Sequence, residues 1–149
     1  MVIHLVNRRG RIPASLRTLR RDLTEILRSL DLEDREVTVV LTGDGEIRDL
    51  NARFLGRDRP TNVLSFSVDE GGPEESPHRV LGDVVISVDT AARDAREGEI
   101  SLEDELVFLM IHGLLHLAGY DHERGGSDEA SMKALERELF RKLKGYEID

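Results

Sequence analysis

The stretch 102–117 constrains the fold more than any other part of the chain. A helix built from it is apolar on nearly all sides, through Leu106, Val107, Phe108, Leu109, Met110, Ile111, Leu114 and Leu115. A helix of this kind is buried inside a domain, because no polar face remains for solvent. Ser101 can cap its N-terminus and Gly119 can end it. The sequence therefore predicts a domain with this helix in its middle.

The other segments predict a sheet surrounded by helices. Strands are expected at 2–6, 36–42, 63–68 and 82–88, from their β-branched or alternating apolar residues. Helices are expected from Pro13 to Leu30, over 44–54 with Asp44 as the capping residue, over 89–97, and from Ser127 to just before Gly145. Because a loop and not a helix joins the last two strands, we expect a mixed four-stranded sheet with about five helices, an α+β fold. Residues 1–149 are predicted to form a single domain.

Composition excludes several classes of function. The chain has no cysteine, so it has no disulfide, thiolate metal site or cysteine nucleophile. Its 21 Lys and Arg against 30 Asp and Glu give a net charge of −9, which argues against indiscriminate coating of nucleic acid but allows a local basic groove. No signal segment or membrane-spanning run is apparent. We therefore expect a cytoplasmic protein without a membrane partner.

Three histidines at fixed spacing predict a metal centre. His112 and His116 are four residues apart, so both imidazoles leave one face of the central helix. Gly119 lets the chain turn, and His122 follows three residues later. Unpaired buried imidazoles each need a polar partner, and one metal ion would serve all three. We expect one Zn²⁺ per chain, bound through His112, His116 and His122, although nickel, iron or manganese also suits imidazole ligands.

The spacing matches the metzincin metalloprotease pattern H-E-x-x-H-x-x-G-x-x-H except at one position. Gly113 stands where those proteases have their catalytic glutamate. Three neutral ligands without a fourth imply an open, catalytic site. Asp121 or Glu123 is the alternative, as a fourth ligand that would close the site.

Three blocks of sequence resemble the YbeY endoribonucleases, also described as rRNA maturation factors. The family ending H-G-x-L-H-L-x-G-Y-D-H matches 112–122, T-[DN]-V-L-S-F matches 61–66, and L-G-D-[IV]-x-I-S matches 81–87. The resemblance implies a zincin-like fold and a zinc-dependent endoribonuclease specific for single strands. It also implies action on rRNA, in maturation of the 3′ end of the small-subunit rRNA and in ribosome quality control. The implied partners are the small ribosomal subunit and its associated proteins.

One family position departs from the pattern. The family usually has an arginine that serves phosphate binding or catalysis where this chain has Leu55. Arg53, Arg57 and Arg59 lie nearby in sequence, and Arg59 is our candidate for a replacement catalytic contact.

Two other functions stay open on sequence grounds. The first is a metallopeptidase that uses Asp121 or Glu123 as its base, which Gly113 disfavours. The second is a metal-stabilised module without catalysis that docks on the ribosome or on a partner protein. A nuclease must bind the phosphate backbone of its substrate. Arg17 and Arg21 are candidates for this role, beside Arg57 and Arg59.

Overall fold

The computed structural model describes residues 2–68, 79–120 and 126–148 of the chain. Its elements follow one another in the predicted order of strands and helices. They are β1 (Val2–Asn7), α1 (Leu16–Ser29), β2 (Arg35–Thr42), α2 (Asp44–Leu55), β3 (Val63–Ser67), β4 (Arg79–Ser87), α3 (Val88–Glu97), α4 (Leu102–Leu117) and α5 (Gly126–Lys144).

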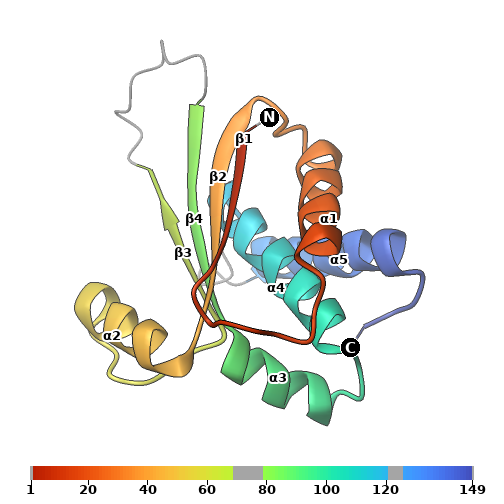
Figure 1. The fold of residues 1–149 in the computed structure, drawn as a ribbon. Coiled ribbons are helices and arrows are strands. Elements are labelled where there is room, and N and C mark those ends of the chain that lie inside the picture. The colour runs from red at the N-terminus through yellow and green to blue at the C-terminus, as the bar shows by residue number, and fades with distance from the viewer. Residues whose placement is uncertain (1, 69–78, 121–125, 149) are drawn as a thin grey trace.

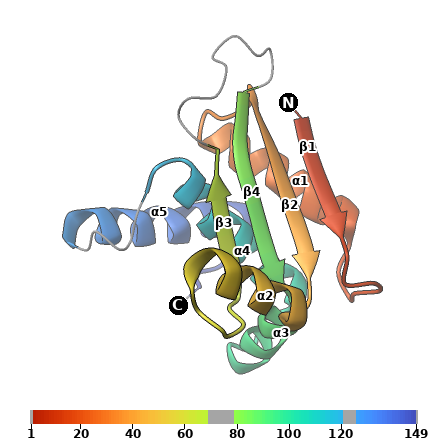
Figure 2. The ribbon, with the colours of Figure 1, turned by 90° about the vertical axis from the view of Figure 1, so that its left-hand side faces the viewer.

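The four strands form one mixed sheet in the order β1-β2-β4-β3. β1, β2 and β4 are parallel, and β3 lies antiparallel to β4 at one edge. Figure 1 shows α1, α4 and α5 on one side of the sheet and α2 on the other. Figure 2 shows how α2 crosses the sheet near the ends of β2 and β4, on the side away from α4. The predicted α+β class and mixed sheet are therefore confirmed.

α4 lies at the centre of the main core, as its sequence predicts. Leu106, Met110, Ile111 and Leu114 are fully buried against the sheet and the helices α1 and α5. A second, smaller core lies between the sheet and α2, around Ile47. No helix among the described residues is long and apolar enough to cross a lipid bilayer.

Capping residues set the helix boundaries. The Ser15 hydroxyl accepts from the Thr18 backbone N–H, so α1 begins three residues after the predicted Pro13. The Ser101 hydroxyl caps α4 as predicted, by accepting from the backbone N–H of Asp104. The prediction that Asp44 caps α2 is wrong, because Gly43 is the N-cap residue. The Asp44 carboxylate instead accepts hydrogen bonds from Ser87 and neighbouring groups at the start of α3.

Candidate metal centre

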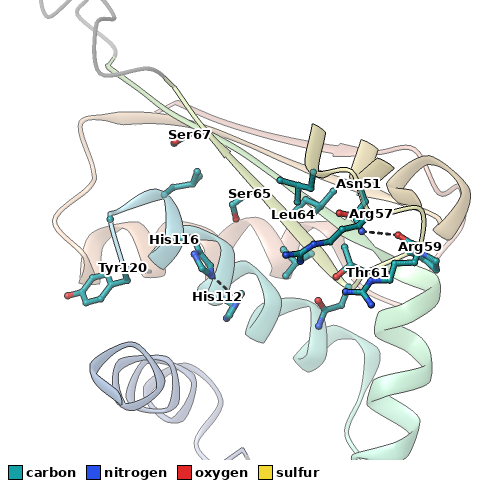
Figure 3. A pocket seen from close by; sticks show the side chains of 16 residues that line it. Asn51, Arg57, Arg59, Thr61, Leu64, Ser65, Ser67, His112, His116 and Tyr120 are labelled. Atoms are coloured by element: carbon teal, nitrogen blue, oxygen red, sulfur yellow. Dashed lines mark hydrogen bonds between the residues drawn. The ribbon is translucent and has the colours of Figure 1, made fainter. Parts of the chain in front are cut away.

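A cleft of about 830 Å³ runs beside the edge strand β3. Its walls come from the end of α2, the loop 56–62, β3 and the C-terminal half of α4. Figure 3 shows His112, His116 and Tyr120 on one side, with Arg57, Arg59 and Asn51 on the other. The cleft therefore brings together two segments of the chain that the sequence separates by about 50 residues, and each of them carries candidate site residues.

His112 and His116 point toward each other from the last two turns of α4. Their Nε2 atoms lie 3.1 Å apart, and their ring centroids are separated by 4.7 Å. The predicted third ligand, His122, lies outside the described residues, as do the alternatives Asp121 and Glu123. Accordingly, the part of the chain that the structure describes contains no group of three or more such ligands.

The spacing of the two imidazoles fits a shared transition-metal ion. Two nitrogens bound to tetrahedral zinc at about 2.0–2.1 Å are separated by about 3.3 Å. The observed separation of the Nε2 atoms, 3.1 Å, is close to this value, so His112 and His116 fit zinc with little change of rotamer. Both rings lie in the wall of the cleft, where a bound ion would be open to substrate.

The other nitrogen of His112 contacts a buried carboxylate. His112 Nδ1 and Glu136 Oε1 form a short hydrogen bond between α4 and α5. Glu136 is only 6% exposed. Sequence reasoning missed this residue because α5 has an ordinary amphipathic pattern. The signal that could have found it is its helical spacing from buried Met132 and Leu139, which places a carboxylate on the buried face.

Gly113 is required by the packing of α4 against the sheet. A Cβ atom at this position would lie 2.6 Å from Val84 Cγ1 and 2.9 Å from Cγ2. Val84 is fully buried in β4, so the added atom would have to displace a core side chain. Ser65 Oγ approaches the same turn, 3.2 Å from the Gly113 carbonyl oxygen to which it donates. At the position that holds a catalytic glutamate in metzincins, a side chain could therefore be accommodated here only if α4 or β4 shifted.

The opposite wall of the cleft carries two guanidinium groups that have no acidic partner among the described residues. Arg57 and Arg59 both line the cleft and are exposed, and neither forms an ion pair with another described residue. Asp58, which lies between them in the sequence, instead accepts hydrogen bonds from Arg48 Nε and Nη2, at 2.8 and 3.3 Å. The hydrogen bond from Arg48 lowers the pKa of Asp58. The loop therefore presents positive charge to the cleft although the whole chain is acidic.

Asn51 holds the arginine loop in place. Its side chain is 2% exposed, and its Nδ2 donates to the backbone oxygen of Arg59 at 2.9 Å. Its own backbone oxygen accepts from Arg57 N–H, just after Gly56 ends α2 with a φ of 68°. Sequence reasoning assigned no role to Asn51.

The other residues considered from the sequence differ in whether they line this cleft. Leu55 lines the cleft and is 52% exposed, so no charged group fills the family's arginine position. Arg17 and Arg21, on α1, do not belong to the lining of this cleft. His4 lies on β1, at the opposite edge of the sheet from β3, and pairs with Glu36 at 2.8 Å.

Comparisons with known proteins point to one family. The family model for endoribonuclease YbeY matches residues 4–144. The chain is 47% identical over 150 aligned positions to the endoribonuclease YbeY of Syntrophus aciditrophicus, covering all of this chain and 94% of the relative. It is 50% identical to that of Geobacter sulfurreducens, over 94% of each chain.

A solved structure supports the fold as well. The solution structure of a Thermotoga maritima protein matches with a TM-score of 0.66 and 33% identity, over 97% of this chain and 90% of that one. The predicted α+β fold, the predicted family and the prediction of a hydrolytic nuclease are thus confirmed. The chain belongs to the YbeY family of endoribonucleases.

Proposed function

We propose that this protein is a metal-dependent endoribonuclease that cleaves single-stranded RNA in the cleft beside β3. The proposed metal is one zinc ion per chain, held by His112, His116 and His122. The main observation behind the proposal is that two imidazole nitrogens lie 3.1 Å apart, across the cleft from Arg57 and Arg59, which form no ion pair within the described part of the chain.

The proposed setting is the cytoplasm, where the enzyme matures the 3′ end of the small-subunit rRNA and contributes to ribosome quality control. Its proposed partners are the small subunit and associated proteins. This assignment is supported by the family, whose members in Syntrophus aciditrophicus and Geobacter sulfurreducens are named endoribonucleases.

The proposed zinc ion and the residues of the cleft have different roles in phosphodiester hydrolysis. A zinc ion at such a site supplies Lewis-acid polarisation of the phosphoryl group and lowers the pKa of bound water. Arg57 and Arg59 bind phosphate oxygens, because a guanidinium group forms two parallel hydrogen bonds with them. Asn51 keeps these arginines aimed at the cleft through its bond to the Arg59 backbone.

The same residues favour RNA over a peptide as the substrate. Peptide hydrolysis in metzincins uses a glutamate beside the first histidine, and the contact of Gly113 with Val84 leaves no space for one. The guanidinium groups across the cleft suit a chain of phosphates. Zinc-loaded protein should therefore cut unstructured RNA, cut duplex RNA much more slowly, and leave casein intact. Casein cleavage that disappears in His116→Ala would reverse the assignment.

Replacement of either cleft arginine should weaken RNA binding in a salt-dependent way. For Arg57→Ala and Arg59→Ala, we expect the slope of log affinity against log salt to fall by roughly 0.7, the value for one lost phosphate contact on a single strand. The cleavage rate should fall with it, because the guanidinium also offsets charge that develops on the phosphate. Binding is measured by fluorescence anisotropy over a salt series.

Arg28→Ala is the matched control for these variants. Arg28 is an exposed arginine on α1 that pairs with Glu25 and lies outside the cleft lining. It should leave both the slope and the rate unchanged. If Arg57→Ala and Arg59→Ala behave like Arg28→Ala, neither arginine contacts the RNA. A gain in rate in Leu55→Arg would then indicate that the family's arginine position is simply unfilled here.

A further inference from the structure

We infer that Glu136 is a positioning residue for the metal centre, which it serves through His112. The inference rests on the proposed function, because it assumes that His112 binds a metal ion. It adds a residue from α5 to a site whose other members come from α2, β3, α4 and the loop 56–62.

Glu136 is located where an apolar residue would be expected. It lies on the face of α5 that packs against α4, among Met132, Leu139 and Phe140, which are 0–5% exposed. The ring of Phe140 packs edge-on against Phe108 of α4, so the two helices are already held together by apolar contacts. These apolar contacts account for the packing of α5 against α4, so the buried carboxylate at position 136 needs a separate explanation.

The hydrogen bond between Glu136 and His112 indicates the role of this carboxylate. Its Oε1 accepts a hydrogen bond from Nδ1 of His112, and Nε2 of the same ring is directed at Nε2 of His116. A neutral imidazole carries one proton. Because Glu136 holds that proton on Nδ1, the lone pair of Nε2 is left for the metal. The bond also fixes the ring plane of His112.

The alternative is that Glu136 and His112 form a structural link between α4 and α5. Zinc affinity separates the two roles. We would measure it by competition with a chromophoric chelator at one fixed pH, for the wild type, Glu136→Leu and Glu136→Gln. Glu138→Gln is the matched control, because Glu138 is an exposed glutamate on the same helix and loses the same charge. Melting temperatures establish that each variant is folded.

Glu136→Leu should bind zinc about 10–100-fold more weakly than the wild type, as found when partners of metal-binding histidines are removed. Glu136→Gln should fall between the two, because its amide oxygen still accepts from Nδ1 but has no charge. Glu138→Gln should match the wild type. The visible spectrum of the cobalt-loaded protein should change in Glu136→Leu, since the ring of His112 is then free to rotate. If Glu136→Leu does not fold, the comparison of Glu136→Gln with Glu138→Gln carries the test.

Three results would overturn the inference, and they differ in what else they overturn. Equal zinc affinity in the wild type and both Glu136 variants would leave the metal site standing and reduce Glu136 to a structural role. The same would follow if Glu138→Gln weakened binding as much as Glu136→Gln, because the effect would then be one of net charge. A wild-type protein that binds no zinc would remove the proposed metal centre, and this inference with it.

Discussion

Replacing His116 with alanine is expected to strip the protein of metal and to lower RNA cleavage by about a thousandfold. The metal's Lewis-acid contribution is worth several kcal/mol, and each 1.36 kcal/mol corresponds to about a factor of ten in rate. His116 faces His112 with 3.1 Å between the Nε2 atoms, so the variant leaves His112 without its neighbouring ligand. Elemental mass spectrometry measures the metal, and a labelled single-stranded RNA measures cleavage.

His4→Ala is the control for this experiment. His4 pairs with Glu36 at the far edge of the sheet, so its loss should change neither metal content nor activity. RNA cleavage that survives in His116→Ala would come from another nuclease in the preparation or from another site. Equal metal content in wild type and His116→Ala would mean that the histidine pair is not a metal centre.

Gly113→Ala is expected to destabilise the protein, although alanine normally stabilises a helix. Helix propensity favours alanine over glycine by about 1 kcal/mol. The new Cβ atom would, however, lie within 2.6–2.9 Å of both methyl groups of Val84, and overpacking a core costs about 1–3 kcal/mol or more. Each net kcal/mol lowers the melting temperature by about 2–4 °C in a chain of this size. We expect a fall of a few degrees in Gly113→Ala and a larger one in Gly113→Glu.

Gly45→Ala shows what alanine does in a helix of this protein without the clash. Gly45 lies in α2, and a Cβ atom there would meet nothing within 4 Å. Its melting temperature should equal or exceed that of the wild type. A melting temperature of Gly113→Ala as high as that of Gly45→Ala would show that α4 and β4 separate easily. Packing would then not exclude a protease base at position 113. Gly113→Glu should also gain no activity on casein.

The sequence predicted the elements and their order because these depend on local signals. A run that is apolar on nearly all sides indicated α4, apolar periodicity indicated α5, and Ser101 indicated the start of α4. The boundary of α1 and the cap of α2 were misplaced by up to three residues. The cap of α2 was misplaced because the Asp44 carboxylate accepts hydrogen bonds from Ser87 and Arg93, which lie in a distant segment of the chain. The strand order β1-β2-β4-β3 also depends on contacts between distant segments.

The site was predictable in part for the same reason. The i, i+4 spacing placed His112 and His116 side by side, because helix geometry alone decides it. That Arg57 and Arg59 rather than Arg17 and Arg21 line the cleft depends on the course of the loop 56–62, which Asn51 fixes. The role of Glu136 could not be predicted, because its contact with His112 depends on the packing of α5 against α4. His122 lies outside the described residues, and its role stays a prediction.

The central claim is that RNA cleavage by this protein requires one metal ion bound through the histidine cluster. The most direct test is to remove all metal with a chelator and then add zinc back while bound zinc and cleavage of single-stranded RNA are measured on the same sample. Cleavage should be absent from the metal-free protein, rise in proportion to bound zinc, and level off at one equivalent per chain. Full cleavage by the metal-free protein, or a rise that continues unchanged beyond one equivalent, would contradict the claim.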